Sequence, residues 1–102
     1  MRPFVKNRLP KMIALLKKHH ITQAYLFGSV NTANFNRKSD VDVLVSIDET
    51  LEPIEQGEHL ILLWDELELL FGRKVDLLTE RSLKNPYFIQ SINQNKQLIY
   101  ES

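Results

Sequence analysis

The sequence of 102 residues contains no cysteine, which excludes disulfide bonds and thiolate metal sites and favours a reducing compartment. It has no excess of charge of either sign, because thirteen Lys and Arg balance thirteen Asp and Glu. The longest near-continuous apolar run, LILLW at 60–64, is too short to span a bilayer, and the N-terminus lacks the apolar core of a secretory signal. These absences predict a cytoplasmic protein that binds no membrane and no nucleic acid directly. The length predicts a single domain over residues 1–102.

The apolar pattern predicts an α/β (α+β) chain with a small mixed sheet flanked by helices. A first helix is expected over 8–19 with Asn7 as N-cap, and a longer helix from Pro3 that bends at Pro10 is the alternative. Strands are expected over 22–28, 41–47, 74–79 and, at an edge, 97–100; helices are expected over 59–71, closed by Gly72, and from near Pro86. Residues 48–58 are acidic, contain Pro53 and Gly57, and predict an irregular surface connection.

The predicted helix 59–71 has a wider apolar stripe than one core face requires. Two interpretations remain open at this point. The helix is either packed on several sides within the core or it presents apolar surface to a partner protein.

Two aspartates stand at the start of the valine-rich strand 41–47, which is expected to be central and buried on both faces. Side chains alternate along a strand, so Asp40 and Asp42 point to the same side with Cα atoms about 6.6 Å apart, close enough to share one cation. Asp76 is a third carboxylate within an apolar strand. If the strands are neighbours, all three acids gather on one sheet face. Such an oxygen-only ligand set suits Mg²⁺ or Mn²⁺ and the metal-assisted chemistry of phosphoryl and nucleotidyl transfer.

Each acid also has a structural interpretation. Asp40 alone would suit a turn at a strand start, and Asp76 alone could pair with Arg73, Lys74 or Arg81. Gly28 and Ser29 favour the functional interpretation of these acids, because a glycine lets the backbone approach a phosphate and a serine hydroxyl adds a hydrogen-bond donor. A Gly-Ser pair is common, but Gly-Ser followed ten residues later by Asp-x-Asp across two strands is a specific pattern.

Three segments carry a resemblance to a known family: LFGS at 26–29, SDVDVLV at 39–45 and GRKVDLLT at 72–79. They resemble the minimal nucleotidyltransferases, which are small proteins of the DNA polymerase β-like superfamily built on its palm fold. The resemblance implies that Gly28 and Ser29 bind nucleotide phosphate. It also implies that Asp40, Asp42 and Asp76 are the catalytic and metal-binding residues, with the third acid helping to activate the attacking hydroxyl.

The resemblance further implies a substrate and a partner. Members of this family act as antitoxins beside a helical HEPN-domain toxin, and are similar to enzymes that transfer AMP from ATP to a tyrosine of that toxin with Mg²⁺ or Mn²⁺. The alternative is an inactive binding module that neutralises the toxin sterically. Transfer to a small molecule such as an aminoglycoside is a weaker third possibility, since no acceptor domain is present in the sequence.

One departure from the family pattern bears on catalysis. Many relatives continue from Gly-Ser in a pattern like GSxARG, whereas this chain has Asn31, Thr32 and Ala33 in place of Ala-Arg-Gly. The arginine that would face the phosphates is therefore absent. Arg37, Lys38 and Lys74 are the candidates to replace its charge.

Overall fold

The fold is known from a computed structural model that describes residues 2–102. Over those residues the elements are α1 (Pro3–Lys6), α2 (Leu9–Lys18), β1 (Ile21–Phe27), the 3-10 helix η1 (Gly28–Asn31), β2 (Val41–Ile47), α3 (Pro53–Phe71), β3 (Val75–Thr79), the 3-10 helix η2 (Glu80–Ser82), α4 (Pro86–Asn95) and β4 (Gln97–Glu101). Every predicted strand is present within a residue or two of its expected bounds.

The four strands form one mixed sheet in the order β3-β2-β1-β4. β1 runs antiparallel to both β2 and β4, whereas β2 and β3 are parallel. A parallel pair needs a crossover connection, and α3 supplies it. The predicted mixed sheet with a helical crossover is confirmed.

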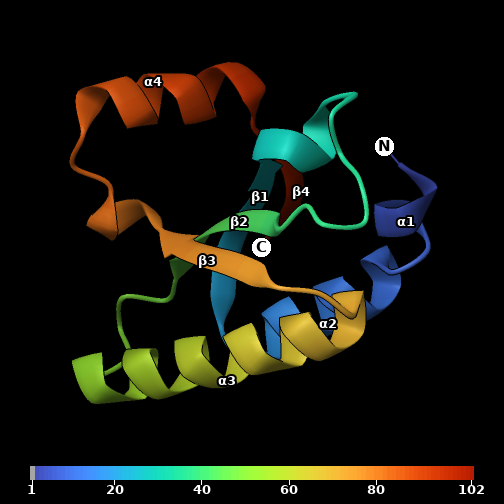
Figure 1. The fold of residues 1–102 in the computed structure, drawn as a ribbon. Coiled ribbons are helices and arrows are strands. Elements are labelled where there is room, and N and C mark those ends of the chain that lie inside the picture. The colour runs from blue at the N-terminus through green and yellow to red at the C-terminus, as the bar shows by residue number, and fades with distance from the viewer. Residues whose placement is uncertain (1) are drawn as a thin grey trace.

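Helices lie on both sides of this sheet: α2 and α3 cover one face and α4 lies over the other (Figure 1). The alternation of side chains along β2 explains both layers. Val43 and Val45 are fully buried in the core cluster that contains residues of α2 and α3, whereas Leu44 packs with Phe27 and Ile92 of α4 on the opposite face. The expectation that β2 is central and buried on both faces is therefore confirmed.

Helix α3 is longer than the sequence pattern indicated. Residues 53–58, expected to be irregular, form its first turns. Pro53 occupies the first helical position, where no N–H is needed, and Gly57 has open space around it, so neither residue stops the helix. Gly72 ends α3 with φ +65° and donates its N–H to Glu68 O at 2.8 Å, as predicted. Across residues 2–102, no helix combines the length and hydropathy that a membrane crossing requires.

The N-terminal helical region is divided into two pieces. Helicity begins at Pro3, as in the longer alternative, but the break lies at Asn7 and Arg8 rather than at Pro10. The prediction of Asn7 as N-cap is wrong, since Arg8 occupies that position without a side-chain cap. The Arg8 guanidinium instead donates to Phe4 O at 3.0 Å and to Leu70 O at 3.2 Å, which ties this break to the end of α3.

Candidate active site

Gly28 stands at the end of β1 and begins η1, in a backbone conformation that only glycine adopts without strain. Its φ is +75°. The neighbouring strand adds a second requirement, because Phe27 pairs with Asp42 and the Asp42 side chain lies over Gly28. A Cβ at position 28 would overlap Asp42 Oδ2 and stand 3.2 Å from Asp42 Cγ. The predicted phosphate-binding glycine and the predicted metal-binding aspartate are therefore in direct proximity.

Two asparagines hold this turn in place: Asn31, noted above only as a departure from the family pattern, and Asn95, which no sequence motif indicated. The Gly28 N–H donates to Asn95 Oδ1 at 2.6 Å. The Asn31 amide donates to Leu26 O at 2.9 Å and to Asn95 O at 3.0 Å. The C-terminal end of α4 is thereby joined to the Gly-Ser turn, across more than sixty residues of sequence.

Asp42 and Asp76 are brought side by side by the register of the parallel strands. They are direct partners in the β2–β3 pairing. The pKa of Asp42 is raised from 3.8 to about 6. Partial burial is the largest cause, because it disfavours the charged form. Repulsion from Asp76, a hydrogen bond with Asp76 and repulsion from Asp40 add to the effect. Phe27 is the strand partner of Asp42 and packs against Phe88, with ring centroids 6.3 Å apart. The expectation that β3 neighbours β2 and gathers these acids is confirmed for Asp42 and Asp76.

Asp40 directly precedes β2 and takes part in a different contact. Its Oδ2 atom lies 4.0 Å from Lys74 Nζ. The backbone beside this pair is fixed, because the Val41 N–H donates to Lys74 O at 3.0 Å. The alternative in which Asp76 forms the structural ion pair is not supported among the described residues, since the recorded pair joins Lys74 to Asp40.

The donor chemistry of these residues fits a divalent cation of the Mg²⁺ or Mn²⁺ type. Two carboxylates crowded at adjacent strand positions, one of them with a raised pKa, are stabilised by a cation between them. Over residues 2–102, however, no three His, Cys, Asp or Glu side chains already surround one point in positions to hold a metal ion. Asp42 and Asp76 thus form the paired part of the site, and Asp40 would have to turn from Lys74 to join them.

The segment between the Gly-Ser turn and Asp40 is held by arginines from elsewhere in the chain. Arg73 donates from Nη1 to Asn36 O at 2.9 Å and to Ser39 O at 3.1 Å, and its guanidinium stacks on Phe35 at 4.7 Å. Arg2 donates to Val30 O at 3.0 Å and also to Thr32 O. No local pattern in the sequence predicted these contacts, because they join residues about thirty or more positions apart in the chain.

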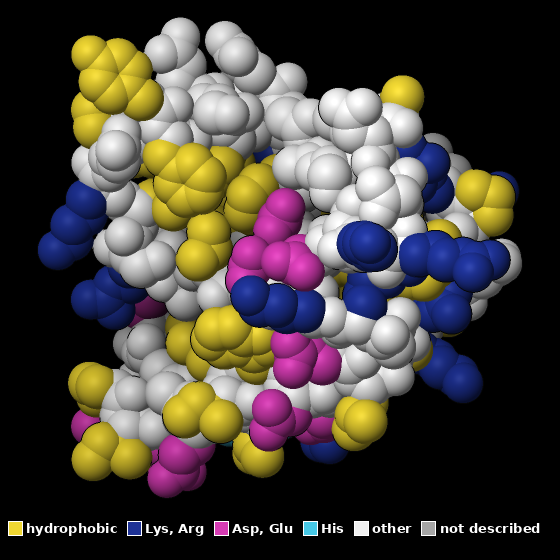
Figure 2. All heavy atoms as spheres, viewed as in Figure 1, with side chains coloured by type: hydrophobic (Ala, Val, Ile, Leu, Met, Phe, Trp, Pro, Cys, Tyr) yellow, Lys and Arg dark blue, Asp and Glu magenta, His cyan; other side chains and the backbone are white. Residues whose placement is uncertain are grey.

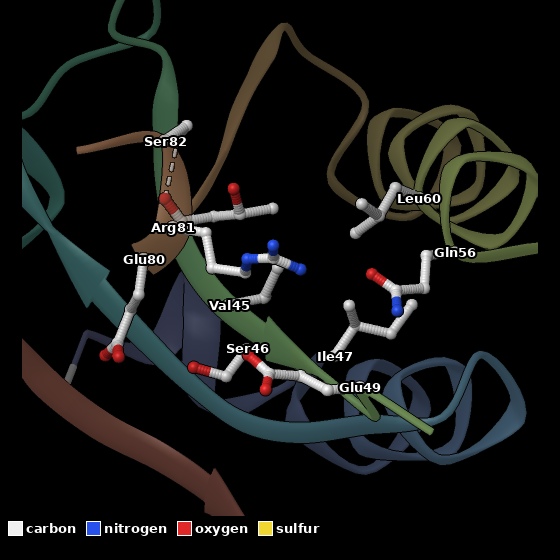
Figure 3. A pocket seen from close by; sticks show the side chains of 10 residues that line it. Val45, Ser46, Ile47, Glu49, Gln56, Leu60, Glu80, Arg81 and Ser82 are labelled. Atoms are coloured by element: carbon white, nitrogen blue, oxygen red, sulfur yellow. Dashed lines mark hydrogen bonds between the residues drawn. The ribbon is translucent and has the colours of Figure 1, made fainter. Parts of the chain in front are cut away.

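The acids lie on an open surface rather than within a deep cavity. Figure 2 shows acidic side chains grouped near the centre of one face, with hydrophobic side chains on one flank and basic ones on the other. A cavity of about 410 Å³ does open at the C-terminal ends of β2 and β3, with Arg81 pointing into it and Glu49 and Gln56 on its wall (Figure 3). It contains none of the predicted site residues. The candidate site is therefore exposed along the β3 edge, where a macromolecule can reach it.

Comparison with known proteins identifies the family. Residues 10–102 match the family described as "Polymerase beta, Nucleotidyltransferase". A "Putative protein adenylyltransferase" of Methanocaldococcus jannaschii is 38% identical over 97 residues, which cover 94% of this chain and 93% of that one. The protein adenylyltransferase MntA of Shewanella oneidensis is 33% identical over 90 residues, which cover 86% of this chain and 62% of MntA.

Solved structures show the same fold. A toxin–antitoxin complex with AMP-PNP contains a chain that is 27% identical, with a TM-score of 0.70 over 92% of this chain and 73% of that one. A structure described as a "putative minimal nucleotidyltransferase" is 25% identical, with a TM-score of 0.67 over 91% and 90% of the two chains. The α/β fold with its mixed sheet is thus that of a minimal nucleotidyltransferase. With this match over most of its length, the chain belongs to the polymerase β nucleotidyltransferase family and, within it, to the minimal nucleotidyltransferases, and by homology it is an enzyme of the protein adenylyltransferase type.

Proposed function

We propose that this protein is a cytoplasmic antitoxin that transfers AMP from ATP to a tyrosine hydroxyl of a HEPN-type toxin, with Mg²⁺ or Mn²⁺ as cofactor. The observation that carries this proposal is the pairing of Asp42 with Asp76 directly beside Gly28. The relative MntA is a protein adenylyltransferase, and a chain of similar fold is part of a toxin–antitoxin complex that holds AMP-PNP.

The residues divide into a phosphate-binding group and an acidic group. Gly28 allows close approach of the triphosphate to the backbone, and its N–H is already bound to Asn95, so the Ser29 hydroxyl is the donor that we assign to a phosphate oxygen. Asp40, Asp42 and Asp76 would hold the divalent cation. When bound, that cation supplies charge neutralisation for the phosphate oxygens and lowers the pKa of the attacking hydroxyl.

The reaction itself is an in-line substitution at phosphorus. The tyrosine oxygen forms a bond to the α-phosphorus of ATP, the bond from that phosphorus to the pyrophosphate oxygen breaks, and pyrophosphate leaves with the electron pair. The phenol proton passes to Asp76, the third acid, which helps to activate the attacking hydroxyl.

The outer face of α3 supports the proposal that the acceptor is a protein. Of the two interpretations of this helix, packing within the core is wrong for several positions, since Ile61 is 64% exposed and Leu69 is 83% exposed. Glu58 and Asp65 lie on the same face at helical spacing, and α3 contains no Lys or Arg. Figure 2 shows hydrophobic and acidic side chains interspersed at the bottom of the molecule, where α3 lies in Figure 1.

The charge on this face favours one kind of occupant. A second copy packed through the same helix would place acids against acids, whereas a helix of the toxin with apolar and basic residues is complementary in both respects. Leu69→Arg should therefore weaken the complex with the toxin without changing the binding of AMP-PNP, and Leu98→Arg, which places the same charge on an exposed leucine of β4, serves as the matched control. A size-exclusion measurement that found a stable dimer of the antitoxin through α3 would contradict this assignment.

The direct test is intact mass spectrometry of the candidate toxin after incubation with this protein, ATP and Mg²⁺. We expect the toxin to gain one or more AMP groups, and to gain none with Asp42→Asn. Glu101→Gln, which removes the same charge from an exposed position of β4 and not from α3, should retain transfer. No AMP gain with the wild-type protein, in a sample where the complex forms, would refute the transferase assignment.

The second candidate function is neutralisation of the toxin by binding alone. The observation that favours it is Thr32, which stands where relatives have an arginine and whose hydroxyl donates within the turn to Ser29 O at 3.0 Å. Growth of cells that express the toxin separates the two functions. Protection by Asp42→Asn equal to that of the wild type indicates binding alone, whereas loss of protection indicates catalysis.

A further inference from the structure

The acidic site lacks the arginine of its relatives, and the structure distinguishes among the cations that could replace it. Arg73 is engaged in the loop, with two carbonyls and two aromatic rings around its guanidinium. Arg37 and Lys38 are exposed and make no ion pair with the three acids within residues 2–102. Lys74 is the one cationic side chain that the described residues place within ion-pair distance of any of them.

The position of Lys74 is fixed by the sheet. Val41 and Val75 are partners in the β2–β3 pairing, so the residues just before them, Asp40 and Lys74, face each other at the entrance of the two strands. The hydrogen bond from the Val41 N–H to Lys74 O holds that entrance together. Lys74 also stands two residues before Asp76, so the side chains of Lys74 and Asp76 leave the strand on the same side.

The ion pair itself is suited to exchange. The Lys74 side chain is 68% exposed, that of Asp40 is 38% exposed, and their charged atoms are at the limit of ion-pair distance. Exposed pairs of this kind contribute little to stability, about 0–1 kcal/mol, and separate readily. A divalent cation competes with the ammonium for the same carboxylate, and an ammonium released in this way remains beside the acids, because Lys74 stands two residues before Asp76.

We propose that Lys74 is the phosphate-binding cation of this site, and that it rests on Asp40 until that carboxylate turns to a divalent cation, after which the ammonium binds the triphosphate of ATP. This inference rests on the proposed function for the identity of the nucleotide. It assigns to Lys74 the charge that the family pattern GSxARG would place at the position of Thr32. It also explains why only two of the three acids are paired in the resting structure.

The test compares Lys74→Gln with Lys74→Arg, and uses Lys38→Gln as the matched control that removes the same charge from the nearby loop. Mn²⁺ binding is measured by electron paramagnetic resonance without nucleotide, and AMP-PNP binding by calorimetry with Mg²⁺. Loss of a charge-assisted hydrogen bond should weaken AMP-PNP binding about tenfold in Lys74→Gln. Removal of the competing ammonium should tighten Mn²⁺ binding about threefold in the same variant. Lys74→Arg and Lys38→Gln should bind AMP-PNP within about twofold of the wild type.

The affinities for AMP-PNP and Mn²⁺ should change in opposite directions in Lys74→Gln, which separates this role from a structural one. Unchanged AMP-PNP binding in Lys74→Gln overturns the proposal, and so does weaker binding of both Mn²⁺ and AMP-PNP, which would mean that the acidic site itself is disturbed. An equal loss in Lys38→Gln overturns it as well, because the effect would then be long-range. Since these readouts require no transfer, a protein that shows them yet modifies no toxin would refute the proposed function and leave the role of Lys74 intact.

Discussion

Replacing Asp42 by asparagine should stabilise the metal-free protein while it abolishes AMP transfer. In the fold the charged form of Asp42 is disfavoured by burial and by Asp76, which raises its pKa from 3.8 to about 6. The native state therefore binds more protons than the unfolded chain between these two values, and stability falls as the pH rises through that window. Asparagine carries no charge, so the variant avoids this loss.

The magnitude follows from the size of the shift. A change from 3.8 to about 6 corresponds to roughly 3 kcal/mol if fully realised, at 1.36 kcal/mol per unit. Because the carboxyl is only partly buried, solvent screening reduces this value to about 1–2 kcal/mol. For a domain of this size that gain raises the midpoint of thermal unfolding by about 5–10 °C.

The assay is thermal unfolding followed by circular dichroism in the presence of EDTA, at about pH 7.5 and about pH 4. We expect Asp42→Asn to be more stable than the wild type at the higher pH and nearly equal to it at the lower one. Asp65→Asn, at an exposed position of α3, should show no comparable gain. If Asp42→Asn were less stable than the wild type at the higher pH, or if its gain were the same at both, the crowding of Asp42 and Asp76 would not be a source of strain.

Three further results are expected. Gly28→Ala should lower the free energy of unfolding, measured in urea, by about 1–3 kcal/mol and should abolish AMP transfer. The reason is that its Cβ would overlap Asp42 at a φ of +75°. Asn95→Leu removes the acceptor of the Gly28 N–H, so it should lower the free energy of unfolding by about 1–3 kcal/mol and speed hydrogen exchange at the Gly28 amide. Asn95→Asp retains an acceptor oxygen, so the Gly28 amide should exchange more slowly in this variant than in the leucine variant. Chelation of divalent cations should abolish transfer in the mass-spectrometric assay, and added Mg²⁺ or Mn²⁺ should restore it; transfer that persists in excess EDTA would contradict metal dependence.

The sequence predicted the elements that carry the site because their signals are local. Gly-Ser after an apolar strand, Asp-x-Asp at the start of a valine-rich strand and Gly72 at a helix end each depend on the backbone preferences of a few residues. The start of α3 was missed for a local reason as well. Proline and glycine favour a turn in isolation, but Pro53 stands at the first helical position and Gly57 has open space around it, so the helix extends through both.

The residue types available for this chemistry follow from the amino-acid order alone: three carboxylates in or beside strands, a Gly-Ser turn and no cysteine. How these residues meet depends on the tertiary fold. The parallel register that places Asp42 opposite Asp76, the contact of Asn95 with Gly28 and the pairing of Lys74 with Asp40 all join segments far apart in the chain. No local preference encodes such contacts, because strand register and the path of α4 are set by the packing of two apolar layers against the sheet as a whole.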